Sequence, residues 1–198
     1  MGSAAILIEF PKAKARPPEV SEEEQAALPT PRMLSWARNA TLSRLERRMM
    51  TERELSEAIV KKAKAKFEDV TEEQLKAISA AAVALAYEQK ALDDGAYARQ
   101  KTQSAVRNGK SKRFIAQTLS AKGVDTEVAA TALQETDDLY AAVVFARKRA
   151  FGPFRRGDAD EKRKAKELSA LARNGFGFTI GNAVFEMSLE EADAILRG

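Results

Sequence analysis

The stretch "SKRFIAQTLSAKGVDTEVAATAL", from Ser111 to Leu133, decides the fold of this 198-residue chain. Ser111 is of the type that caps helix starts, and Gly123 is of the type at which helices end in a left-handed conformation. Apolar residues recur in and around the stretch at helical spacings, which predicts short amphipathic helices that close on a common core. The predicted core residues are Tyr97, Phe114, Ile115, Leu119, Val124, Val128 and Leu133.

The same order of features recurs elsewhere in the chain. Residues Glu161–Phe185 again show a basic entry, a Leu-Ser-Ala triplet, a glycine and an apolar helix, and Thr51–Ser79 follows the order with a longer connection and no glycine. Each piece is preceded by another helical stretch, and internal repeats of this kind are typical of tandem arrays. We therefore predict an all-α protein, an elongated tandem array of three three-helix repeats over residues 31–92, 93–137 and 138–198.

Residues 1–30 differ from the rest in composition. Four prolines and the run "SEEEQAAL" predict a flexible N-terminal arm. The apolar run "AAILI" is too short for a signal peptide and lacks a basic region before it, and no apolar run approaches the roughly 18 residues of a membrane span. We expect a soluble, cytoplasmic and monomeric protein without a membrane partner.

Cysteine and histidine are both absent. Their absence removes disulfides, thiol nucleophiles, zinc sites built on those ligands and His-based catalytic triads. The tripeptide Gly109-Lys110-Ser111 ends like a P-loop, but Ser104 stands where the first glycine is required, and the residues before it read as helix. The pair Asp93-Asp94 predicts a helix cap instead of a metal site. We expect no enzyme, no cofactor and no metal.

The net charge of +4 hides a strong alternation along the chain. Residues 95–123 carry seven Lys and Arg and no acid, whereas residues 124–139 carry five Asp and Glu and no base. This segregation predicts a repeated positive surface that meets phosphates or an acidic protein groove. The predicted partner-binding residues are Arg99, Arg107, Lys110, Lys112, Arg113, Lys122, Arg147, Lys148 and Arg149.

The residues "ALDDGAYARQKTQSAVRNGKSKRFIAQTLSAKGVD", from Ala91 to Asp125, resemble those of the RecX regulatory proteins, the bacterial modulators of RecA recombinase. Shared features are Leu-Asp-Asp, an aromatic-Ala pair, a glycine with a basic entry, and Lys-Gly-Val-Asp. The stretches "TERELSEAIVKKA" and "LARNGFGFTI" support the resemblance, although the first unit has "AKAKFEDV" where a Lys-Gly turn is usual.

The resemblance implies an elongated, curved protein that lies in the helical groove of the RecA–DNA filament. There it would inhibit ATP hydrolysis, strand exchange and filament extension by occupancy. Its implied partners are the RecA filament and DNA, single- or double-stranded.

A different class of function is also open, namely a DNA-binding protein that acts without RecA. The two short predicted helices around Gly123 are similar to a helix-turn-helix. The second of them begins with Asp125, Thr126 and Glu127, where base-reading Arg, Asn or Gln are expected. Sequence-specific reading is therefore the weaker form of this alternative, and non-specific binding stays open.

Overall fold

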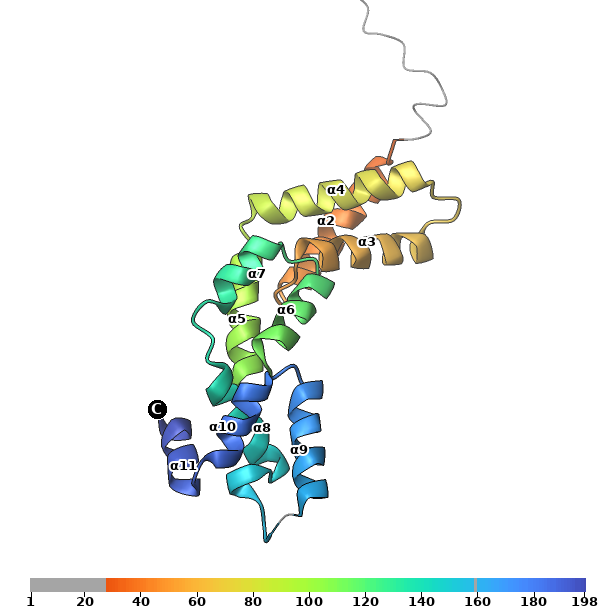
Figure 1. Ribbon diagram of the computed structural model, residues 1–198. Helices are drawn as coiled ribbons and strands as arrows, with labels where there is room; N and C mark the ends of the chain where they lie inside the picture. Colours follow the sequence, from red (N-terminus) through yellow and green to blue (C-terminus); the bar gives the residue numbers. More distant parts are fainter. Residues whose placement is uncertain (1–27, 159) are drawn as a thin grey trace, which may run out of the picture.

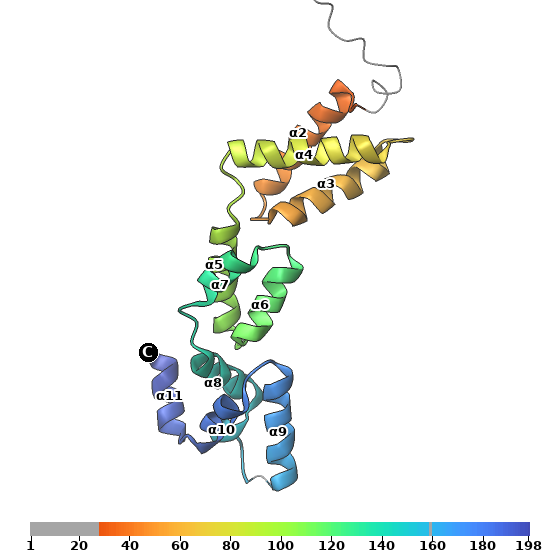
Figure 2. The same ribbon diagram turned by 45° about the horizontal axis from the view of Figure 1, so that its top comes forward.

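The computed structural model describes residues 28–198 except residue 159. Within this part of the chain the regular structure is entirely helical, which confirms the all-α fold class. The helices follow one another as three groups along an elongated, bent molecule, visible from two directions in Figures 1 and 2. Residues 1–27 of the predicted arm, which spans residues 1–30, lie outside the described residues.

The first group contains α2 (Pro31–Leu45), α3 (Glu52–Lys66) and α4 (Glu72–Glu88). Thr51 stands three residues before Glu54, and Thr71 three residues before Gln74, a spacing that predicts capping boxes. The structure confirms both, and they start α3 and α4. The group closes on a core of its own that includes Met33, Leu55, Ile59, Ile78 and Ala82.

The second group contains α5 (Asp94–Arg107), α6 (Lys112–Ala121) and α7 (Thr126–Leu133). Of the predicted core residues, Tyr97, Ile115, Leu119 and Val124 are buried, and Val128 and Leu133 pack partly buried against them. The prediction is wrong for Phe114, which is 38% exposed. Ile115 and Leu119 are four residues apart on the face that meets the core, and Phe114 points about 100° away from Ile115 around the helix.

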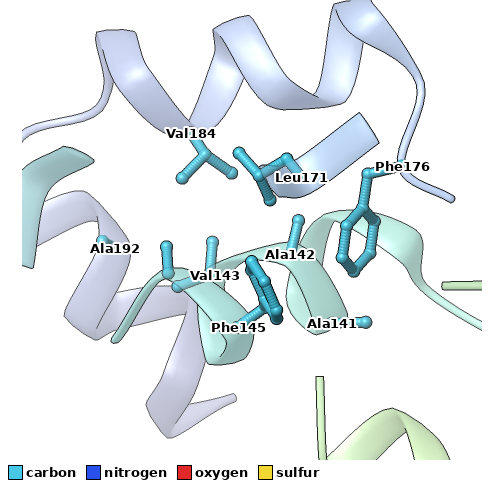
Figure 3. Packing of buried hydrophobic residues seen from close by; sticks show 9 residues of the cluster. Ala141, Ala142, Val143, Phe145, Leu171, Phe176, Val184 and Ala192 are labelled. Atoms are coloured by element: carbon cyan, nitrogen blue, oxygen red, sulfur yellow. The ribbon is translucent and has the colours of Figure 1, made fainter. Parts of the chain in front are cut away.

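The third group contains α8 (Asp138–Arg149), the short 3-10 helix η1 (Gly152–Phe154), α9 (Glu161–Arg173), α10 (Phe178–Glu186) and α11 (Leu189–Arg197). Figure 3 shows its core, in which Val143 and Phe145 of α8 face Leu171, Phe176 and Val184. Residues 138–198 thus hold one α-helix more than the three we predicted. The extra helix α11 forms because Ser188 and Glu191 make a capping box and Ala192 is buried in the same core.

Helices α3, α6 and α9 lie along one side of the molecule in both views (Figures 1 and 2), and they meet end to end. The hydroxyl of Thr51, at the start of α3, donates to the backbone carbonyl of Lys122 at the end of α6, at 2.7 Å. The hydroxyl of Ser111, at the start of α6, donates to the carbonyl of Asn174 at the end of α9, also at 2.7 Å. Both hydroxyls also accept a hydrogen bond from the backbone of their own helix. One polar atom therefore caps a helix and joins two groups.

We call the contact between two neighbouring groups a joint, and a pair of consecutive aspartates lies at each one. Asp137 caps its own helix α8, while Asp138 accepts a hydrogen bond from the backbone N–H of Lys112 at 2.7 Å. In the other joint Asp93 caps α5, which confirms the predicted cap. Burial raises the pKa of Asp94, and the backbone N–H of Glu52 opposes this as a hydrogen-bond donor to its carboxylate. The first turn of α6 is thus held by an aspartate of the following group, and the carboxylate of Asp94 takes the equivalent place beside the first turn of α3.

Two glycines allow the helix ends to come this close. Gly123 and Gly175 have φ of +80° and +86°. A Cβ at Gly123 would lie 2.6 Å from side-chain carbons of Arg53, and one at Gly175 would lie 2.5 Å from Oγ of Ser111. A side chain at either position would therefore force the joint apart. The predicted left-handed helix end at Gly123 is confirmed, and close packing is a second reason for the glycine.

Candidate partner-binding surface

The turn Asn108–Lys110 connects α5 to α6 and packs directly on α8. Gly109 follows residues that read as helix and comes two residues before Ser111, a capping residue type, so the sequence predicts a helix end there. In the structure Gly109 ends α5 with φ of +73°. A Cβ at Gly109 would lie 2.8 Å from the backbone nitrogen of Phe145, so only a glycine permits the contact. This packing brings the turn, and Lys110 within it, to the basic last turn of α8.

Three predicted site residues surround this turn, and we call Lys110, Lys148 and Arg149 the boundary cluster. Nζ of Lys148 donates to Oδ1 of Asn108 at 3.0 Å, and the guanidinium of Arg149 lies over the ring of Phe145, 5.7 Å from its centre. None of the three cations pairs with a carboxylate in the part of the chain that the structure describes. The cluster therefore carries positive charge that is free for a partner.

The first turn of α6 extends the positive surface toward the third group. Lys112 is anchored through its backbone to Asp138, and Arg113 is exposed. Arg113 lines a small hollow of about 270 Å³ at the joint between α6 and α9, together with Gln117 and Arg173. Because the first turn of α6 contains no acidic residue, the charges of Lys112 and Arg113 add to the positive end of the helix dipole.

Arg99 and Arg107 lie apart from the boundary cluster, on the face of α5 that meets α7. Both line a pocket of about 530 Å³ whose lining also includes Glu135 and Asp137. Neither arginine forms an ion pair with a carboxylate among the described residues. These two predicted residues thus line a different pocket from the one that Lys110 lines.

Lys122 forms an ion pair at the joint between the first and second groups. Its ammonium lies 2.8 Å from Oε1 of Glu54, across the contact between α3 and α6, and Arg48 approaches the same carboxylate at 3.5 Å. Burial acts to raise the pKa of Glu54, but the hydrogen bond and charge of Lys122 hold it below its ordinary value. Most of the charge of Lys122 is thus engaged within the chain, whereas Arg147 is exposed on the last turn of α8.

Phe114 is a surface feature that the sequence reading missed. Nζ of Lys110 lies 4.5 Å from the centre of its ring, a cation–π contact on the exposed face of α6. Its ring stands between the hollow at Arg113 and a second, apolar groove between α5 and α6. The available signal was its place directly after Lys112 and Arg113, one residue off the stripe formed by Ile115 and Leu119.

The described residues hold no group of three or more acidic side chains arranged to bind a metal ion. None of the helices in residues 28–198 is long and apolar enough to cross a membrane.

Comparison with known proteins identifies the family of the chain. A family model described as the second three-helix domain of RecX matches residues 93–133, which span α5 to α7. A regulatory protein RecX from Agrobacterium fabrum is 60% identical over 178 residues, which cover 90% of this chain and 97% of that relative. The chain belongs to the RecX family of regulatory proteins. A second RecX, from Myxococcus xanthus, is 34% identical over 85% of this chain and 94% of its own length.

Solved RecX structures share the fold. A crystal structure of RecX from Lactobacillus salivarius superposes with a TM-score of 0.60 at 21% identity, covering 83% of this chain and 99% of that one. A second crystal structure of a regulatory protein RecX superposes with a TM-score of 0.62 at 26% identity, covering 85% of this chain and 79% of that one. These similarities agree with an all-helical array as the architecture of the family.

Proposed function

We propose that this RecX protein binds the RecA–DNA filament in the cytoplasm and inhibits RecA ATP hydrolysis, strand exchange and filament extension. It acts as a monomer and by occupancy, without catalysing a reaction. Membership of the RecX family supports a regulatory role. The chain also has no histidine or cysteine with which to build the commonest nucleophilic sites.

The observation that carries the proposal is the boundary cluster, held at a joint between two groups of a long array. Lys110 and Lys148 come from different groups, and the turn at Asn108 fixes them together. Since joints of the same construction occur on both sides of α6, the array holds its bend and offers one extended surface. Such a surface suits a partner that is itself long and helical.

The charge of the surface fits a partner that presents acidic or phosphate groups. The boundary cluster, Lys112 and Arg113 face outward without a described carboxylate partner, and complementary charge of this kind raises association rates and selects partners. Of the predicted site residues, we assign the contact to these five and to Arg147, and we give Arg99, Arg107 and Lys122 a smaller share.

The direct test is the single-stranded-DNA-dependent ATPase of RecA, assayed with this protein at sub-stoichiometric and stoichiometric amounts. We expect inhibition that saturates as the protein approaches the amount of RecA present. An ATPase rate that stays unchanged at stoichiometric protein contradicts the proposal.

The alternative function, direct binding to DNA without RecA, is favoured by one observation. Arg113 and Arg173 line the same hollow, where a phosphate would meet both guanidinium groups. Binding to free DNA over a salt series separates the two functions, because contacts to phosphates weaken steeply with salt. Strong, salt-sensitive binding to DNA together with no effect on preformed RecA filaments supports the alternative.

A further inference from the structure

We propose that the groove between α5 and α6 is a docking site for an acidic segment of the filament protein. One apolar side chain of this segment, flanked by carboxylates of the same segment, inserts into the groove. The inference rests on the proposed function, since it names the part of the filament protein that would bind in this groove. The groove has a volume of about 490 Å³ and lies on the outer face of the second group.

The groove combines apolar side chains with the polar side chains of Ser104, Asn108 and Thr118. Ala105 of α5 and Ile115 and Leu119 of α6 line it, and Phe114 forms the wall at the end near the boundary cluster. Ile115 and Leu119 are nearly fully buried and present little exposed apolar surface to the groove, whereas Phe114 is 38% exposed. A preformed apolar groove of this size accepts a branched aliphatic or aromatic side chain, because filling it removes apolar surface from water.

The two ends of the groove are positive. Lys101 and Lys110 are part of its lining, which includes no Asp or Glu. Both ammonium groups have defined positions, because Nζ of Lys101 lies 5.3 Å from the ring centre of Tyr97 and Nζ of Lys110 lies 4.5 Å from that of Phe114. Lys148 adds a third cation through its hydrogen bond to Asn108, which is also a lining residue. Acidic residues on both sides of the inserted side chain would meet these cations.

The same observations favour protein over nucleic acid as the occupant. The ammonium of Lys110 already occupies one face of Phe114, so this ring offers a base at most one face on which to stack. The groove includes no arginine in its lining, whereas the two arginines suited to a phosphate lie in the separate hollow on the other side of Phe114. An acidic amphipathic segment fits both the apolar lining and the charged ends.

The test fills the groove without changing any charge. Ser104 is an exposed lining residue of α5, and Ser104→Phe places a ring over the groove. The matched control is Ser169→Phe, the same change at an exposed serine of α9. A second variant, Phe114→Ala, removes the wall instead of filling the space. Circular dichroism and thermal unfolding establish that each variant is folded.

The probe is a RecA filament assembled on single-stranded DNA with a non-hydrolysable ATP analogue, and the same DNA without RecA is measured in parallel. We expect Ser104→Phe and Phe114→Ala to weaken filament binding by about tenfold or more, as for the loss of a central apolar anchor. Binding to free DNA should stay within about twofold, and Ser169→Phe should change neither affinity.

Each other result overturns the inference in a distinguishable way. Unchanged filament binding by both groove variants contradicts the docking site and leaves the proposed function standing. An equal loss of filament and free-DNA binding identifies the groove as a nucleic-acid site. Failure of the unaltered protein to bind the filament contradicts the proposed function and removes the partner named here.

Discussion

The hydroxyl of Ser111 donates to the backbone carbonyl of Asn174 at 2.7 Å, across the contact between the second and third groups. The same oxygen accepts the N–H of Phe114 at 3.2 Å and so caps α6. Since Ser111 is fully buried, water has no access to replace either hydrogen bond. Thr51 and Lys122 repeat the arrangement at the preceding joint, so a buried hydroxyl group contributes to each of the two joints.

Replacing Ser111 by alanine should cost more than the loss of a helix cap. Ser111→Ala leaves the Asn174 carbonyl without its donor and removes the cap, for an expected loss of about 2–3 kcal/mol in the free energy of unfolding. The control is Ser188→Ala, which removes a capping serine that joins no groups and should cost about 1 kcal/mol. Urea unfolding measures both variants. Equal losses would show that the hydrogen bond to Asn174 contributes nothing.

Adding a methyl group at Gly175 should open the same joint. Gly175→Ala places Cβ 2.5 Å from Oγ of Ser111 at a φ of +86°. Gly157 has a φ of +82° and nothing within 4 Å of the added Cβ, so Gly157→Ala measures the backbone penalty alone, about 1–2 kcal/mol. We expect Gly175→Ala to lose about 1–3 kcal/mol more than this, as overpacking does. If the two variants have the same midpoint temperature of thermal unfolding, the added Cβ at Gly175 does not force the joint apart.

The same change at two buried threonines should have opposite effects. Thr41 is fully buried in the first group, and its hydroxyl has no hydrogen-bond partner among the described residues. Thr41→Val keeps the shape, removes an unsatisfied polar group and should stabilise the protein by about 1 kcal/mol. Thr51→Val removes a hydroxyl with two partners and should destabilise it. A loss of stability in both variants would contradict this account of Thr41.

Glu167 should make the stability of the third group depend on acid pH. Its buried carboxylate pairs with Arg155 at 2.7 Å and Arg163 at 3.2 Å, and it accepts the N–H of Gly152. Burial acts to raise the pKa of Glu167, but these partners hold it below its ordinary value. A lowered folded-state pKa gives stability that is present above the unfolded pKa of about 4.3 and is lost as pH falls toward the folded value.

The measurement for Glu167 is urea unfolding of the unaltered protein and of Glu167→Gln at a series of pH values. The difference in stability between them should be largest near neutral pH and should shrink below about pH 4. A difference that stays constant down to about pH 2 would show that the charge of Glu167 has no part in holding η1 to α9.

Local chemistry made much of the fold predictable. The caps at Thr51, Thr71 and Ser111 and the helix ends at Gly109 and Gly123 follow from residue type and spacing, and the structure confirms them. Phe114 was assigned to the core because apolar spacing does not separate a buried position from its exposed neighbour on a ten-residue helix.

The contacts between groups could not be predicted from the sequence. The second function of Asp138, as an acceptor for the first turn of α6, joins residues 26 positions apart, and the pairing of Lys122 with Glu54 joins residues 68 positions apart. No local pattern indicates which lysine of a basic stretch is neutralised in this way. The recurrence of Asp-Asp at 93–94 and 137–138, like that of the glycines at 123 and 175, is a sequence signal of equivalent joints.

The most direct test of the account reverses the charge of the surface at the second joint. The variant Lys110→Glu/Lys112→Glu/Arg113→Glu is compared with a control that carries the same number of charge reversals at exposed residues of the first group, Arg38→Glu/Lys76→Glu/Lys90→Glu. Inhibition of the RecA ATPase is measured for both, with circular dichroism to show that helical content is intact. We predict that the first variant loses inhibition while the control retains it. Undiminished inhibition by the folded first variant would contradict the assignment of this surface as the site of regulation.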